Sequence, residues 1–395
     1  MSNSPALEWL YGVEKIGVKL GLESTRRLFE ALEIDTSSTT VIHVAGTNGK
    51  GSTCAFIEAI CRKLGKKTGL YTSPHLVNFN ERIRVDFTPV DQAKLDGTIL
   101  LLRDMVSNWD PHPTYFELST ALAVKTFVDA KVDVIVLETG LGGRLDSTNV
   151  VKSDLAVITQ IALDHQAELG DTIQAIAGEK AGIIKPNQIV VTGNQRTEAH
   201  RVISARADEV GADFHVVKEA WLDEIGLSGG HQRWNAALAA EAIRSAFGDC
   251  ETEIKSGIQS AVWPARFQLI DRPNKRPVII DGAHNPAAMR EVVRSWRDRF
   301  GAEKAAIVFG AVSDKEPQKL LAELTRITGA LFPTSTPTER GLSAEELVEQ
   351  TGITKANAAD SFRLAIRMAE ATQLPVLVTG SLFLAGEAVE YFEAI

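Results

Sequence analysis

The stretch VIHVAGTNGKGST at residues 41–53 decides the fold of this chain. Its β-branched start predicts a buried strand, its glycines predict a loop, and a helical pattern follows. Glycines let backbone N–H groups approach phosphate oxygens closely, and a helix N-terminus adds partial positive charge. Lys50 is then placed to reach the β- and γ-phosphates of a nucleotide, and Ser52 to contact phosphate or a magnesium ion. The alternative is a plain strand–turn–helix junction with a solvated lysine.

This loop departs from the usual phosphate-loop pattern G-x-x-x-x-G-K-S/T. Only two residues separate Gly46 from Gly49, and Gly51 stands between Lys50 and Ser52. All the physical parts of a phosphate site are nevertheless present, namely a strand, glycines, a lysine, a hydroxyl and a helix. We therefore predict nucleotide binding at this loop.

Short β-branched runs alternate with longer stretches of helical spacing along the chain. Strands are predicted at 41–45, 132–137, 155–161, 189–192, 278–280, 305–309 and 376–378, and helices at 53–64, 119–128 and 234–246. This alternation predicts an α/β fold with parallel sheets covered by helices. The polar segment 271–277 contains two prolines, so we interpret it as a linker between a domain at 1–272 and a smaller one at 273–395. A long surface loop inside one domain is the alternative.

Composition excludes several classes of protein. The 395 residues are 44% hydrophobic and 24% charged, which is typical of a globular chain. The net charge of −9 argues against a nucleic-acid coat, which needs a basic surface. No apolar run is long enough to span a membrane, and the first residues lack the features of a secretory signal. Three scattered cysteines suit free thiols, so a cytoplasmic location is expected.

Polar side chains follow two of the expected strands and one further short run. Glu138 ends the run 132–137 and precedes a glycine-rich segment, and a carboxylate in this place beside a phosphate loop suits magnesium. The alternative is an acidic loop residue that happens to follow a strand. His165 follows the run 155–161, and residue type alone leaves it open between a structural and a ligating role. Ser73 follows the run 68–71 and adds only a weak signal.

Lys180 stands among small and apolar neighbours in the stretch IAGEKAGII at 176–184. A buried ammonium is costly unless it is paired or chemically changed. The residues alone favour a lysine that extends to solvent or pairs with Glu179 or a distant acid.

Taken together, these segments resemble the folylpolyglutamate synthase/dihydrofolate synthase family of the Mur ligase superfamily. The matching segments follow the family's order and are residues 43–52, 72–76, 80–84, 138–149, 163–165, 178–186, 234–237, 263–267 and 281–286. Each is modest alone, but the combination is specific. The resemblance implies a P-loop-containing Mur-ligase-type ATPase domain followed by a smaller Rossmann-like α/β domain, with ATP at their interface.

The resemblance also implies roles for individual residues. The implied ATP contacts are Gly49, Lys50, Gly51, Ser52, Asn235, Arg266 and Asp281. The implied magnesium ligands are Ser73, Glu138 and His165, and the implied pterin contacts are Tyr115, Phe116, Glu117 and Asp146. The implied catalytic residues are Lys50, Lys180 and His284. Lys180 matches the family's carbamylated lysine, which reverses the interpretation of Lys180 as a paired lysine. Ala265 stands where many relatives have glycine, which puts the loop geometry of Arg266 in question.

The implied reaction is ligation of L-glutamate to a pterin or folate carboxylate, driven by ATP and Mg²⁺. The acceptor is dihydropteroate, tetrahydrofolate or both, as in folate biosynthesis. The acceptor carboxylate attacks the γ-phosphate, and glutamate then displaces phosphate from the acyl phosphate. Lys50 and magnesium neutralise charge in the first step. The resemblance places His284 and the C-terminal domain near glutamate, with the segment 271–277 as the hinge for domain closure.

Two other classes of protein compete with this reading. Another Mur-type ligase would carry an N-terminal UDP-sugar domain, for which the chain leaves no room before residue 46. A switch or motor ATPase would hydrolyse ATP without a pterin acid or glutamate. We expect a monomer that binds neither nucleic acid nor membrane.

Overall fold

The computed structural model describes residues 4–17, 21–352 and 357–394. The chain divides into two compact units, which are treated one at a time below. The first contains Met1–Glu224 and Trp234–Ala261, and the second contains Ile225–Arg233 and Val262–Ile395. The chain therefore passes between the units after residues 224, 233 and 261.

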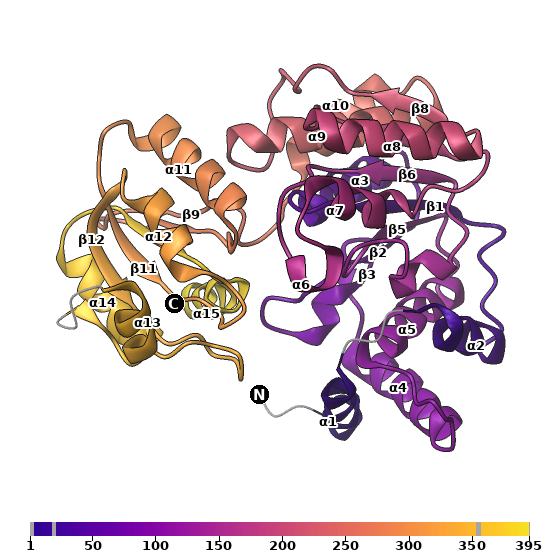
Figure 1. Cartoon of the computed structure of the whole chain (residues 1–395), viewed down its shortest axis with the longest axis horizontal. Coiled ribbons are helices and arrows are strands. Elements are labelled where there is room, and N and C mark those ends of the chain that lie inside the picture. The colour runs from indigo at the N-terminus through magenta and orange to yellow at the C-terminus, as the bar shows by residue number, and fades with distance from the viewer. Residues whose placement is uncertain (1–3, 18–20, 353–356, 395) are drawn as a thin grey trace. The chain divides into compact units, whose positions relative to one another are not determined.

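The first unit is built on a sheet of eight strands within its described residues, in the order β4-β3-β2-β5-β1-β6-β7-β8 (Figure 1). The strands are β1 (Thr40–Ala45), β2 (Thr68–Tyr71), β3 (Ile83–Val85), β4 (Thr88–Pro89), β5 (Val134–Glu138), β6 (Leu155–Ile158), β7 (Ile189–Thr192) and β8 (Asp213–Val216). Strands β2, β5, β1, β6, β7 and β8 are parallel, and only the β3 and β4 edge is antiparallel. Buried residues run without alternation along the central strands, as expected for a sheet covered on both faces.

Helices pack on this sheet and form two apolar clusters with it. The α-helices of the first unit are α1 (Pro5–Gly12), α2 (Glu23–Ala31), α3 (Lys50–Lys63), α4 (Gln92–Val106), α5 (Tyr115–Asp129), α6 (Gln166–Leu169), α7 (Ile173–Ala181), α8 (Thr197–Val210), most of α9 (Gly230–Phe247) and α10 (Glu251–Ser260). Helix α5 packs on β5 in one apolar cluster, and α7 and α8 pack on β6 and β7 in another. Helix α3 packs against β1, β2 and β5 and is itself covered by α10.

The second unit contains a five-stranded sheet within its described residues, in the order β12-β11-β13-β10-β9. Its strands are β9 (Gln268–Ile270), β10 (Val278–Ile280), β11 (Ala305–Phe309), β12 (Thr328–Pro333) and β13 (Val376–Thr379). Its helices are α11 (Pro286–Phe300), α12 (Pro317–Leu324), α13 (Ala344–Thr351), α14 (Phe362–Ala371) and α15 (Leu382–Glu393). Four strands are parallel and β9 is antiparallel. Both units thus confirm the α/β class.

The polar segment 271–277 joins β9 to β10, which pair antiparallel with Ile270 opposite Val278. It is a hairpin loop inside the second unit, so its interpretation as an inter-domain linker and hinge is wrong. The division predicted at residue 272 falls within this hairpin, whereas the second unit resumes at Val262. Proline and polar residues suit a hairpin loop as well as a linker. Strand β9 has only three residues, all of them partly buried. It therefore lacks the run of buried apolar residues by which a sequence predicts a strand.

Within the described residues, no helix is both long and apolar enough to cross a membrane.

The edge strand β8 carries a charge cluster with a testable pH dependence. His215 lies between two acids, with Nε2 3.1 Å from Asp213 Oδ2 and Nδ1 2.9 Å from Glu241 Oε1. Hydrogen bonds to Asp213 and then Glu241 raise the pKa of His215 above its ordinary value. Its stabilising contribution is therefore present below the unfolded pKa and is lost as pH rises through the folded pKa.

We expect His215→Gln to lower the free energy of unfolding at about pH 5.5 and to have no effect at about pH 8.5. The loss stays below about 1 kcal/mol because the pair is partly exposed. Urea titrations at both pH values measure it. A loss of equal size at both would show that the histidine contributes packing rather than charge.

Candidate functional site at the phosphate loop

Two glycines of the phosphate loop hold positions that no other residue fits. A Cβ on Gly46 would lie 1.8 Å from Thr159 Oγ1, and Gly46 has φ +153°. Gly49 has φ +90°, and a Cβ there would lie 2.4 Å from Asn235 Oδ1 on α9. Both close approaches require the absence of a side chain. They also place Asn235, one of the implied ATP residues, directly beside the loop.

The loop leads directly into the N-terminus of α3. No side chain of the described residues caps this helix. Its first backbone bond runs from the N–H of Thr53 to the carbonyl of Gly49, 2.9 Å away. The preceding amides, at Lys50, Gly51 and Ser52, therefore lie in the first turn, whose N–H groups point out of the helix end. This arrangement suits an anion such as a phosphate.

The rest of the loop is held by the segment that follows β6 and by its own lysine. The N–H of Thr47 donates to the carbonyl of Gln160 at 2.8 Å, and its hydroxyl donates to the carbonyl of Ala162 at 3.1 Å. Lys50 Nζ donates to the carbonyls of Gly46 and Thr47 at 3.2 and 3.4 Å. The ammonium thus lies folded over the loop. The sequence did not indicate Thr47 as an anchor, because only the sheet order brings the segment after β6 to the loop.

Ser73 and Glu138 meet at the same end of the sheet. Glu138 is the buried last residue of β5, and its Oε2 accepts the N–H of Ser73 at 3.1 Å. The register pairs Glu138 with Val44 of β1, so the carboxylate lies one strand away from the phosphate loop. A carboxylate and a hydroxyl beside phosphate oxygens form a donor set that fits magnesium, which commonly binds one or two carboxylates plus substrate phosphates.

His165 lies beyond the end of β6, immediately before α6, with φ +49°. Its Nε2 is 4.0 Å from Asp164 Oδ1, and 41% of its side chain is exposed. Across the described part of the chain, no three His, Cys, Asp or Glu side chains form a group that could hold a metal. A metal at Glu138 would therefore need further oxygen donors, and its ligation by His165 stays a prediction.

Lys180 is almost completely buried on α7, with 4% of its surface exposed. Burial, and then the charge of Lys50, lower its pKa to about 7, against the opposing effect of Asp164, Asp146 and Glu179. The interpretation of Lys180 as a solvated lysine is thus wrong. Glu179 instead forms an ion pair with Arg144, 2.8 Å away. The fold places a lysine with a weakened charge within electrostatic reach of the phosphate-loop lysine.

Three of the four implied pterin residues begin α5, and the fourth, Asp146, ends the segment 140–146. Glu117 accepts the N–H of Thr114 at 2.7 Å and so closes a capping box at the start of α5. The Phe116 ring fills the place of a side chain at Gly140, whose Cβ would lie 2.4 Å from Cζ. Tyr115 stacks on Tyr11 with ring centroids 6.0 Å apart.

Asp146 is buried, and both of its oxygens are engaged. Oδ2 accepts the N–H of Leu141 at 2.8 Å, and Oδ1 accepts the N–H of Thr148 at 3.0 Å. The Asp146 carboxylate therefore holds the backbone of the segment 140–146 in place by hydrogen bonds. A direct contact between Asp146 and the pterin stays a prediction.

Two implied residues of the second unit, Asp281 and His284, follow β10, and a third, Arg266, precedes β9. Asp281 accepts the N–H groups of Phe267 and Ala283, both at 2.8 Å. Burial raises the pKa of Asp281, while the nearby Arg266 lowers it. His284 Nδ1 lies 2.9 Å from the carbonyl of Gly282.

Ala265, where the family resemblance implies a glycine, has φ +55°. It takes the left-handed conformation that glycine adopts without strain, at a cost of about 1–2 kcal/mol. Its carbonyl still accepts the N–H of Gly282 at 3.0 Å. The loop of Arg266 therefore keeps a glycine-like geometry despite the substitution.

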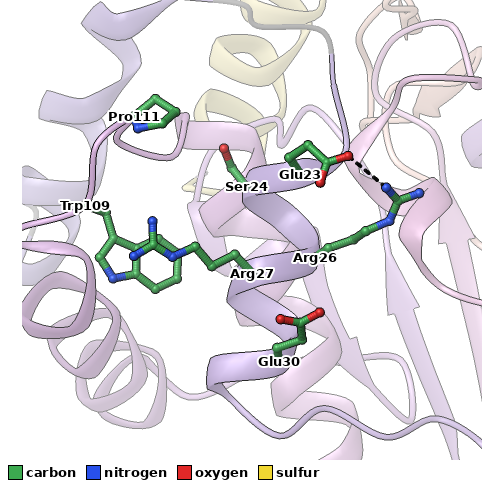
Figure 2. A pocket seen from close by; sticks show the side chains of 7 residues that line it. All are labelled: Glu23, Ser24, Arg26, Arg27, Glu30, Trp109 and Pro111. Atoms are coloured by element: carbon green, nitrogen blue, oxygen red, sulfur yellow. Dashed lines mark hydrogen bonds and ion pairs between the residues drawn. The ribbon is translucent and has the colours of Figure 1, made fainter.

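A separate cavity of about 330 Å³ lies beside α2, lined by Glu23, Ser24, Arg26, Arg27, Glu30, Trp109 and Pro111. The guanidinium of Arg27 lies 3.8 Å from the centroid of the Trp109 ring, and Arg26 pairs with Glu23 at 3.0 Å (Figure 2). None of the implied site residues lines it.

Comparison with known proteins identifies the family. Residues 44–218 match the Mur ligase middle domain, and residues 265–382 match the Mur ligase glutamate ligase domain. The chain is 35% identical to the dihydrofolate synthase/folylpolyglutamate synthase of Bacillus subtilis, over 96% of each chain.

Solved structures agree with this. Escherichia coli FolC in complex with DHPP and ADP is 33% identical, with a TM-score of 0.88 over 100% of this chain and 99% of that one. A bifunctional folylpolyglutamate synthase/dihydrofolate synthase with Mn, AMPPNP and L-glutamate bound is 31% identical, with a TM-score of 0.88 over 99% and 98% of the two chains. With relatives of this similarity along its whole length and the phosphate loop in place, the chain belongs to the folylpolyglutamate synthase/dihydrofolate synthase family of Mur ligases.

Proposed function

We propose that this chain ligates L-glutamate to the carboxylate of a pterin acid or folate, using ATP and Mg²⁺. The observation that carries the proposal is the convergence of the phosphate loop, the Ser73–Glu138 pair and the buried Lys180 at one end of one sheet. Family membership supports the choice of substrates. Both dihydropteroate and tetrahydrofolate are proposed acceptors, as the bifunctional relatives suggest.

In the first step the acceptor carboxylate attacks the γ-phosphate of ATP, which gives an acyl phosphate and ADP. We assign Gly49, Lys50, Gly51 and Ser52 to the phosphates, because the α3 amides and the Lys50 ammonium gather there. Magnesium, when bound, neutralises charge on the transferring phosphoryl group. Ser73 and Glu138, with His165, are its proposed ligands. Asn235, Arg266 and Asp281 are the remaining proposed ATP contacts.

In the second step the amine of glutamate attacks the acyl carbon and phosphate leaves. His284 is the residue proposed to act on glutamate. Tyr115, Phe116, Glu117 and Asp146 are proposed to form the acceptor site, of which Asp146 and Glu117 hold the backbone. Exclusion of water protects the acyl phosphate from hydrolysis during this step.

The test is a product assay with dihydropteroate and tetrahydrofolate offered separately. We expect ADP release that needs both a pterin acid and glutamate, and a product heavier by one glutamyl residue. ATP hydrolysis unchanged by either substrate would favour a switch ATPase. Ligation of another amino acid in place of glutamate would favour a different Mur-type ligase.

We expect Glu138→Ala and His165→Ala to raise the Mg²⁺ concentration needed for half-maximal activity, or to abolish activity. Loss of an oxygen or nitrogen donor weakens metal binding, and excess metal compensates only in part. Magnesium titrations of the ligation rate measure this. Glu198→Ala, an exposed carboxylate on α8, is the matched control. Magnesium curves that coincide with that of the control for both variants would remove the two residues from the metal site.

A further inference from the structure

His43 is a buried polar residue in the strand that leads to the phosphate loop. It lies in β1, three positions before Gly46, and none of its surface is exposed. Its Nε2 is 2.8 Å from the hydroxyl of Thr148, which lies 105 positions along the chain in the short 3₁₀ helix Ser147–Val150. The same hydroxyl lies 2.5 Å from Asp146 Oδ1.

The direction of these bonds follows from the donors around Asp146. Its two oxygens accept the N–H groups of Thr148 and Leu141, so the carboxylate acts as an acceptor. Thr148 therefore donates its one hydroxyl proton to Asp146 and accepts from His43. The proton of the imidazole must then lie on Nε2.

The environment of Nδ1, the other nitrogen of His43, indicates that the bond from Nε2 to Thr148 is what requires a histidine at this position. Among the described residues, Nδ1 is buried without a hydrogen-bond partner. Such a group costs on the order of 1–3 kcal/mol, which an apolar side chain would avoid. Burial, reinforced by the charge of Lys185, also holds the pKa of His43 well below its ordinary value, so the ring is neutral.

We call the hydrogen-bonded chain His43–Thr148–Asp146 the relay. It ends at the segment 140–146, which bears the proposed acceptor site. Asp146 holds the N–H of Leu141, next to Gly140, against which the Phe116 ring packs. This segment begins two residues after Glu138. One buried chain of hydrogen bonds thus joins the phosphate-loop strand to the loop 140–146.

We propose that His43 is a positioning residue for the acceptor. Through Thr148 it fixes Asp146 and the loop 140–146, and so it sets the KM for the pterin acid rather than for ATP. The identity of the substrate in this inference rests on the proposed function. The hydrogen bonds that link His43 to Asp146 do not depend on that function.

Two pairs of variants, one pair at each position, test this chain of hydrogen bonds. Thr148→Val removes the hydroxyl and keeps the shape, whereas Thr148→Ser keeps the hydroxyl. His43→Leu removes the Nε2–H donor, whereas His43→Gln keeps a donor at that reach. We expect Thr148→Val and His43→Leu to raise the KM for the pterin acid roughly tenfold, with less than a twofold change in the KM for ATP. Thr148→Ser and His43→Gln are expected to stay close to the parent enzyme.

The double variant His43→Leu/Thr148→Val should be no worse than the worse single variant, because both break the same chain of bonds. Equal increases in both KM values, or fully additive effects, would overturn the proposal. Thermal unfolding checks that each variant folds.

A second measurement needs neither a variant nor activity. ¹⁵N NMR of imidazole-labelled parent enzyme should show a neutral His43 with its proton on Nε2. A proton on Nδ1 would overturn the relay even if every variant failed to fold. Conversely, an Nε2–H signal in a protein without ligase activity would leave the relay intact and reject the proposed function.

Discussion

Lys180→Ala is expected to leave almost no ligase activity, with a fall in kcat of about 10²–10³ or more. The side chain is buried, and burial together with the charge of Lys50 lowers its pKa to about 7. A bare ammonium there would add to the positive charge of Lys50 in a site proposed to bind Mg²⁺. We propose instead that Lys180 is carbamylated: the neutral amine attacks CO₂, an N–C bond forms and a proton leaves. The resulting anion offers the oxygen donors that magnesium prefers.

The pKa gives this prediction its pH dependence. The neutral amine, which alone reacts with CO₂, predominates above about pH 7 and is lost as pH falls below that value. Activity should therefore fall with CO₂ removal, and most steeply at low pH. A ¹³C carbamate signal after labelling with ¹³CO₂ would measure the modification directly.

Variants separate the carbamate from a purely structural lysine. Acetate should partly restore Lys180→Ala by supplying a carboxylate. Glu179→Ala, next to it but paired with the exposed Arg144, is the control and should keep most activity. An active Lys180→Ala variant, or an enzyme without a carbamate signal at full activity, would contradict this role.

Lys50→Ala should lower kcat by about 10²–10³ and leave the fold intact. The Lys50 ammonium lies at the start of α3 against the carbonyls of Gly46 and Thr47, so it is placed to move onto a phosphate. Its loss removes a preorganised positive charge from the γ-phosphate in the first step. ADP formation under saturating ATP measures the effect.

The control for this variant is Lys63→Ala, an exposed lysine in the last turn of the same helix. Thermal unfolding of both variants should match the parent protein, because neither side chain fills the core. Turnover of Lys50→Ala equal to that of Lys63→Ala would exclude the assigned role.

Local chemistry made part of this site predictable. The strand, the glycine loop and the helix at 41–53 follow from neighbouring residues, because backbone freedom at Gly46 and Gly49 and the helical pattern after Lys50 are local properties. Glu138 was predictable in the same way, as a carboxylate at the end of an apolar run. The hairpin at 268–280 was not, since its first strand is short and half-buried and the loop reads equally well as a linker.

The sequence by itself determined the α/β class, the phosphate loop and, through the order of its motifs, the family. Only the tertiary structure decided which distant side chains meet. The sheet order β2-β5-β1-β6 brings Ser73 to Glu138 and the segment after β6 to Thr47. Packing of α7 buries Lys180, and packing of the segment after β5 sets Thr148 against His43. The physical reason is that burial and hydrogen bonding between residues 65 to 115 positions apart depend on strand order, which no local pattern encodes.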